Sequence, residues 1–163
     1  MNTLTLYRFN GTEQYRLSEA SAYAALVGEG QERSVMLWFE TETDTEPVVR
    51  LPDPDEIYNN PSAEVTVYMD VLNLNEPGVR EFSFESGYNK DGSSLDARLY
   101  YFEHQEVCHN QVRLEYKGEG IFHVWWSGTT MDINYYDGSK PDTRIEVEGE
   151  FFFAEYKTWQ AET

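Results

Sequence analysis

The chain has little positive charge, a single cysteine and no long apolar run. Lys and Arg together number 12 against 30 Asp and Glu, which gives a formal net charge of −18. Because phosphate binding needs a basic surface, this balance excludes direct binding of nucleic acid and disfavours anionic membrane surfaces. Cys108 has no partner for an intrachain disulfide, and no apolar stretch approaches the roughly 18 residues that a membrane span requires.

The first ten residues, MNTLTLYRFN, lack the basic start, apolar core and small-residue cleavage site of a signal peptide. Together with the single cysteine, this predicts a protein of the reducing cytoplasm, with no membrane attachment. The 163 residues are 40% apolar and 15% aromatic, too rich in core-forming side chains for a disordered acidic tail. We therefore expect one folded domain that spans residues 1–163.

Alternation of apolar and polar residues dominates the chain. Val65, Val67 and Met69 fall on one face of a predicted strand, and Ile145, Val147 and Phe151 share one face of another. The pattern predicts a mainly β fold: a single-domain antiparallel β-sandwich or flattened barrel of about eight strands, with one short helix. The predicted strands cover 3–9, 34–40, 64–71, 79–85, 96–103, 107–116, 121–127 and 144–153.

The helix is predicted over 19–27, because this segment is rich in alanine, Ser18 suits an N-cap and Gly28 suits a C-terminal stop. Two long stretches, 41–63 and 128–143, are predicted to be irregular. The buried face of the sheet is predicted to hold Val65, Val67, Met69, Leu114, Val124, Trp126, Ile145, Val147 and Phe151.

One hairpin can be set in register from the sequence. Strands 111–117 and 121–127 flank Gly118-Glu119-Gly120, and a three-residue loop that ends in a left-handed glycine is a common connection. This register pairs Tyr116 with Phe122, Leu114 with Val124 and Val112 with Trp126, which places all six apolar side chains on one face. The other face then sets Glu115 opposite His123 and Arg113 opposite Trp125.

Metal and catalytic motifs find little support. His104, Cys108 and His123 lie within 20 residues of one another but lack a zinc-site spacing. Asp132, Asn134, Asp137 and Asp142 suggest an irregular calcium loop, yet the segment fails the EF-hand pattern at three positions. We find no nucleophile elbow and no nucleotide-binding glycine loop. The sequence thus predicts a protein that is not an enzyme, without metal or cofactor, and a metal-dependent enzyme stays a second alternative.

Acidity is the strongest functional signal. Seven acidic residues fall between Glu40 and Glu56 against one base, Arg50. The net charge exceeds the roughly 2–8 that solubility of a small domain needs. We therefore predict a binding protein that occludes a basic surface of a macromolecular partner, with no direct contact to nucleic acid. The predicted partner-binding residues are Glu146, Glu148 and Glu150 along one strand face, with Trp125, Asp132, Tyr135, Tyr136, Asp137 and Asp142.

In size, acidity and strand content the chain is similar in type to toxin-neutralising immunity proteins and to inhibitors from phages and plasmids. That likeness implies an inhibitor that acts by occlusion and assigns no residues. The alternative is a β-sandwich module for a small ligand or carbohydrate. It would use the 128–143 loop, with Trp125, Tyr135 and Tyr136 as a flat aromatic platform.

Overall fold

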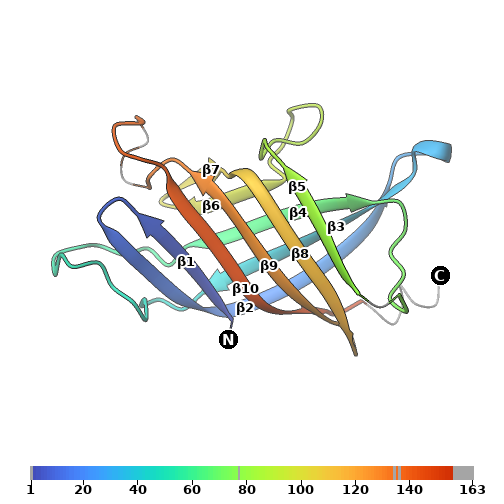
Figure 1. The fold of residues 1–163 in the computed structure, drawn as a ribbon, viewed down its shortest axis with the longest axis horizontal. Coiled ribbons are helices and arrows are strands. Elements are labelled where there is room, and N and C mark those ends of the chain that lie inside the picture. The colour runs from blue at the N-terminus through green and yellow to red at the C-terminus, as the bar shows by residue number, and fades with distance from the viewer. Residues whose placement is uncertain (1, 77, 134, 136, 156–163) are drawn as a thin grey trace.

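The computed structural model describes residues 2–76, 78–133, 135 and 137–155, and they form one ten-stranded sheet (Figure 1). Its order is β5-β8-β9-β10-β1-β2-β3-β4-β6-β7, with every pair in that order antiparallel. The strands are β1 (Thr3–Arg8), β2 (Gly11–Val27), β3 (Ser34–Thr43), β4 (Ser62–Met69), β5 (Val79–Phe84), β6 (Ala97–Tyr101), β7 (Glu103–Glu106), β8 (Cys108–Gly118), β9 (Ile121–Thr130) and β10 (Thr143–Phe153).

The sheet bends into two layers that enclose the core, but it does not close (Figure 1). One layer carries β5, β8, β9, β10 and β1, and the other carries β3, β4, β6 and β7. The first part of β2 pairs with β1 and its second part pairs with β3, so this strand passes from one layer to the other. A short parallel contact, Phe152↔Ser21 and Phe153↔Ala22, joins β10 to β2 at one corner.

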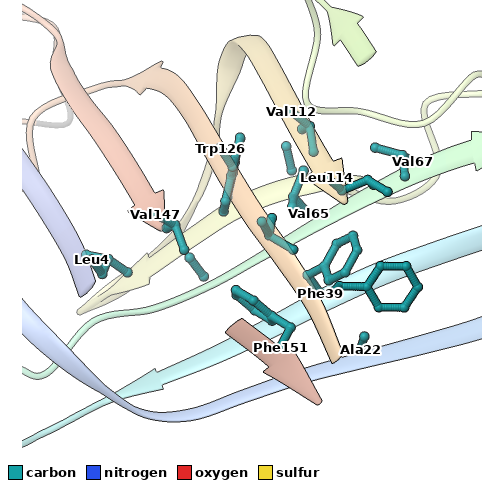
Figure 2. Close-up of a cluster of buried hydrophobic side chains, with 14 of the residues drawn as sticks. Leu4, Ala22, Phe39, Val65, Val67, Val112, Leu114, Trp126, Val147 and Phe151 are labelled. Atoms are coloured by element: carbon teal, nitrogen blue, oxygen red, sulfur yellow. The ribbon is translucent and has the colours of Figure 1, made fainter. Parts of the chain in front are cut away.

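The core lies between the layers, where the inward side chains of both sets of strands meet (Figure 2). Phe39 of β3 packs edge-to-face against Phe122 of β9 and Phe151 of β10, with ring centroids 5.8 and 5.4 Å apart. These contacts join the two layers directly. Of the nine residues predicted to face inward, eight are buried and Met69 is partly buried against the same cluster.

The predicted hairpin register is confirmed. Tyr116 pairs with Phe122, Leu114 with Val124 and Val112 with Trp126, and on the outer face Arg113 lies opposite Trp125. The connection differs in detail, because Gly118 already pairs with Ile121 and the register shifts between Tyr116 and Gly118. A two-residue turn plus one bulged residue thus gives the same register as the three-residue loop.

The predicted helix over 19–27 is wrong, because these residues form the second part of β2. The only helical element among the described residues is a 3-10 turn, η1 (Gly30–Glu32). Helix preferences differ by less than about 1 kcal/mol per residue, whereas a strand in the middle of a sheet gains hydrogen bonds and burial on both sides. Ala22 and Ala24 face the core here, and Ser21 and Tyr23 face outward.

The described residues form two strands more than the eight predicted, and the additional strands are β2 and the short edge strand β7. The predicted irregular stretches are shorter than expected, since β3 runs to Thr43 and β9 to Thr130. Across the described ranges, no helix has the length and apolar character needed to cross a membrane.

Candidate functional site

The loop between β9 and β10 begins with a buried carboxylate and not with a surface one. Asp132 is 1% exposed and accepts hydrogen bonds from Arg8 Nε at 3.0 Å, from Arg8 Nη2 at 3.1 Å and from the Thr143 hydroxyl at 3.1 Å. Arg8 ends β1, so this bidentate ion pair fastens the loop to the β1–β2 hairpin. Asp132 therefore does not lie on the face where a partner would meet it.

A second buried carboxylate completes this network. Glu13 is fully buried and accepts hydrogen bonds from Arg8 Nη1 at 2.9 Å and from the hydroxyls of Tyr15 and Tyr101 at 2.8 and 2.7 Å. Burial alone would lower the pKa of Arg8, but hydrogen bonds to Asp132 and Glu13 outweigh it and raise the pKa. Burial and the Glu13 charge raise the pKa of both tyrosines, so both phenols stay protonated donors.

The other predicted loop residues have separate surroundings. Tyr135 is 39% exposed and packs edge-to-face against Phe9 at 5.5 Å, with Lys140 Nζ 5.2 Å from its ring. The Asp137 carboxylate accepts the backbone N–H of Ser139, and hydrogen bonding from Ser139 lowers the pKa of Asp137. Asp142 is exposed, and Tyr136 lies outside the described residues.

The predicted carboxylate ladder lies on the outer face of β10, where bases neighbour it. Glu146 pairs with Arg144 at 3.1 Å, and Glu148 lies 3.6 Å from the His123 ring nitrogen. The neighbouring strands add Arg113 and Lys117, and Arg113 pairs with Glu81 at 3.1 Å. We call this outer surface of β8, β9 and β10 the mixed-charge face; it is made by Arg113, Glu115, Lys117, His123, Trp125, Arg144, Glu146, Glu148 and Glu150.

Trp125 and Tyr135 do not share a platform. Trp125 lies in the middle of the mixed-charge face, with the Arg113 guanidinium 6.0 Å from its ring. The strand β9 ends at Thr130, five residues and about 16 Å along the strand from Trp125. Tyr135 lies beyond that end, in the loop that follows. The structure thus separates the aromatic residues that a loop-based ligand site would combine.

The histidines and Cys108 are also spread along the sheet. Cys108 pairs with Thr129 near one end of the β8–β9 hairpin, whereas His123 pairs with Glu115 near the other end. Burial and the Glu106 charge raise the pKa of the Cys108 thiol. No set of three or more His, Cys, Asp or Glu side chains is placed to hold a metal ion in the described part of the chain, to which Asn134 does not belong.

Four further acidic side chains lie close together on the opposite layer. Register places Glu19 directly opposite Glu42 across β2 and β3, and Glu40 directly opposite Glu64 across β3 and β4. We call these four outward side chains the acidic face. Arg98 of β6 pairs with Glu64, and in the described ranges Glu19, Glu40 and Glu42 form no ion pair.

Like charges set directly opposite one another across strands destabilise a sheet. The electrostatics of Glu42 show this cost: partial burial raises the pKa of Glu42, and the charges of Glu19 and Glu40 raise it further. Arg98 offsets the charge of Glu64 in one of the two opposed pairs, whereas the Glu19↔Glu42 pair has no cation in the described ranges and works against the stability of the sheet.

An aromatic pair adjoins the acidic face on the same strands. Tyr23 and Trp38 lie opposite one another across β2 and β3, and their rings stack with centroids 5.5 Å apart and planes 21° apart. The Trp38 indole N–H donates to the Glu40 carboxylate at 3.2 Å. Because both rings are half-buried, this part of the surface offers flat apolar area next to carboxylates.

Sequence reasoning missed the acidic face because it interpreted 19–27 as a helix. In a helix, Glu19 and Tyr23 would share one face, because they are four residues apart. In a strand, Glu19, Ser21 and Tyr23 lie on one face and Ala20, Ala22 and Ala24 lie on the other. That alternation was the available signal. The Arg8 network was missed as well, although Arg8 follows Leu4 and Leu6 at inward-facing positions.

A hollow lies beside β4 and the loop that follows β5. It has a volume of about 990 Å³ between β4 and the 85–96 loop, and Tyr68, Tyr88 and Asp96 line it. The Tyr68 hydroxyl donates to Asp96 at 3.0 Å; burial raises the pKa of Asp96 and raises that of Tyr68 to about 12. The opposing charges of Lys90 and Asp91 at its rim indicate no particular ligand.

Comparison of the chain with protein-family models, with curated proteins and with solved structures finds no match.

Proposed function

We propose that this protein is a non-enzymatic, cytoplasmic binding protein that covers a basic surface of a macromolecular partner. It would act as an inhibitor or immunity-type protein. The observation that carries the proposal is the pair of opposed carboxylate pairs, Glu19↔Glu42 and Glu40↔Glu64, on one outward sheet face. Natural proteins keep locally destabilising arrangements where function needs them.

Charge complementarity selects the partner. A net charge of −18 draws a basic surface from a distance and speeds encounter, while Glu19, Glu40 and Glu42 of the acidic face form no ion pair in the described ranges. A partner's lysines or arginines would relieve the repulsion between these carboxylates. Binding would therefore stabilise the sheet as well as the complex.

The aromatic pair supplies the apolar part of such an interface. Aromatic residues are enriched among the side chains that dominate binding energies, and Tyr23 and Trp38 are already stacked and held in place. Trp38 in turn orients Glu40 through its indole N–H. The contact would combine a rigid aromatic patch with carboxylates beside it.

This proposal moves the main contact from the predicted ladder on β10 to the acidic face. The carboxylates of Glu146 and Glu148 already have basic neighbours, so a partner would have to displace Arg144 and His123 to use them. Asp132 is committed to Arg8 within the protein. Glu150, Asp142 and Asp137 stay candidate peripheral contacts.

Charge reversals on the two faces test the proposal. We would compare Glu40→Lys/Glu42→Lys on the acidic face with Glu146→Lys/Glu148→Lys on the mixed-charge face, because both change the net charge equally. The probe is a fluorescently labelled nona-arginine peptide, with affinity measured by anisotropy as salt is raised. We expect the acidic-face variant to lose about tenfold or more in affinity relative to the other. Equal losses in the two variants would refute the site.

A further inference from the structure

A small hollow opens on the acidic face beside the opposed carboxylates. Its volume is about 160 Å³, and it lies among β3, β4, β6 and β7. Sites for drug-sized ligands have about 300–1,000 Å³. A hollow that displaces about five waters suits the end of one side chain instead. Its polar and aromatic walls are Glu40, Glu42, Glu64, Arg98, Tyr100 and His104.

The carboxylates around this hollow are spaced for a branched donor. Glu40 and Glu42 point to the same side of β3, two residues and thus about 6.7 Å apart along the strand, and Glu64 lies directly opposite Glu40. An arginine guanidinium has five N–H donors in a flat fork and can bond two carboxylates at once. A lysine ammonium is a compact point charge, and it gains less from carboxylates that lie apart.

The same wall already binds one guanidinium. Arg98 reaches Glu64 from the neighbouring strand, so the surroundings of Glu64 suit this group sterically. The protein's own arginine leaves Glu40 and Glu42 without an ion pair within the described residues, although Glu40 accepts the Trp38 indole N–H. A second guanidinium would complete the pairing of charges around the hollow.

The aromatic ring of Tyr100 is also part of the lining. Tyr100 is 39% exposed and contacts His104, with ring centroids 4.7 Å apart. Guanidinium groups stack on aromatic faces and shed water more easily than ammonium groups. The hollow therefore offers both features that favour arginine over lysine.

We infer that this hollow is an anchor site for a single arginine side chain of the basic partner. The guanidinium would lie between Glu40 and Glu42 and against the ring of Tyr100. The inference rests on the proposed function and deepens it by naming the side chain that the acidic face selects.

Two peptides of equal charge test the anchor. We would measure the affinities of nona-arginine and nona-lysine for the wild-type protein and for Tyr100→Leu, Tyr100→Phe and Trp125→Leu. The wild type should prefer the arginine peptide by about fivefold to tenfold, a difference of the size of one stacked contact. Tyr100→Leu should abolish the preference, while Tyr100→Phe and Trp125→Leu should keep it. Circular dichroism would confirm that each variant is folded.

The two proposals fail in different ways. Equal affinities of the wild type for the two peptides, or a preference that survives Tyr100→Leu, would overturn the arginine anchor. The acidic face would still stand if the Glu40→Lys/Glu42→Lys variant bound both peptides weakly. Loss of the preference in Trp125→Leu would assign arginine recognition to the mixed-charge face and overturn the anchor as well.

Discussion

At the scale of single residues, the fold treats its carboxylates in two opposite ways. Glu13 and Asp132 are buried and bonded to Arg8, with tyrosine and threonine hydroxyls as further donors. Glu40 and Glu42 are exposed and lack a cation within the described ranges. The first group holds the end of the molecule together, whereas the second group is available to a partner.

Arg8→Leu should destabilise the protein strongly, because it leaves two buried carboxylates without their counter-charge. We expect a loss of about 3–5 kcal/mol in the free energy of unfolding, measured by urea denaturation at neutral pH. The matched control is Arg113→Leu, which breaks the exposed pair with Glu81 and should cost less than about 1 kcal/mol. Similar small losses in both variants would show that the Arg8 network adds little to stability.

Glu42→Gln should raise the free energy of unfolding, whereas Arg8→Leu lowers it. Because the pKa of Glu42 is raised in the folded state, the folded protein binds this proton more tightly than the unfolded chain does, and stability falls as pH rises through the titration. At neutral pH the substitution should therefore increase the free energy of unfolding by a few tenths of a kcal/mol.

The gain from Glu42→Gln should vanish near pH 4, where glutamates take up their protons. Urea unfolding at both pH values would measure this. Glu146→Gln serves as the control, since it removes a carboxylate that is paired with Arg144 and should not stabilise the fold. A gain for Glu42→Gln that persisted at pH 4 would contradict the electrostatic explanation.

At the scale of elements, the β8–β9 hairpin and the β2 strand show what sequence patterns can predict. The hairpin register followed from Leu114, Val124 and Trp126, because only one register buries all the apolar side chains. The strand β2 was mistaken for a helix because Ala20, Ala22 and Ala24 suit both structures. Its pairing with β3 and β1 is a long-range property that local preference does not contain.

In the candidate site, too, local patterns were predictable from the sequence and the pairing of distant strands was not. An acidic surface was predictable from composition, but the position of the acidic face was not, since the opposed pairs Glu19↔Glu42 and Glu40↔Glu64 depend on which strands are neighbours. The β10 ladder was visible as alternation in one segment. Its basic neighbours Arg113 and His123 come from other strands and could not be placed beforehand.

A second feature at this scale is the close packing of the 85–96 loop against the start of β6 and against Val107. Gly87 accepts backbone N–H groups from Asp96 and Ala97, and a Cβ at this position would lie 2.5 Å from the Val107 carbonyl oxygen and 2.7 Å from that of Ala97. Gly87→Ala should therefore cost about 1–3 kcal/mol in the free energy of unfolding, measured with urea. Lys90→Ala, in the exposed part of the same loop, should be nearly neutral. An unchanged free energy of unfolding in Gly87→Ala would mean that the loop can move away from Val107 and Ala97 at no cost.

At the scale of the whole molecule, the net charge of −18 bears on stability as well as on the proposed binding. Mutual repulsion among carboxylates favours the more expanded unfolded chain, and salt screens that repulsion. Raising NaCl from about 0.02 M to about 0.3 M should therefore stabilise the folded protein by about 1 kcal/mol and raise the melting midpoint by about 2–4 °C.

Calorimetric scans in NaCl and in KCl would test this expectation, because screening predicts the same rise for both salts. Peptide binding should weaken over the same range of salt, since screening also reduces attraction to a basic partner. A midpoint that stayed level or fell would show that the acidic residues are accommodated without net repulsion.

The seventeen-residue strand β2 joins the buried Arg8 network to the acidic face. Its first part holds Glu13 in the buried network, and its second part carries Glu19 of the acidic face and the adjoining Tyr23. Because one continuous strand pairs with β1 in its first part and with β3 in its second part, we expect the two layers to unfold together. Amide protons of β2 should consequently exchange with solvent only when the entire protein unfolds, and an occupied acidic face would slow that exchange as far away as the Arg8 network.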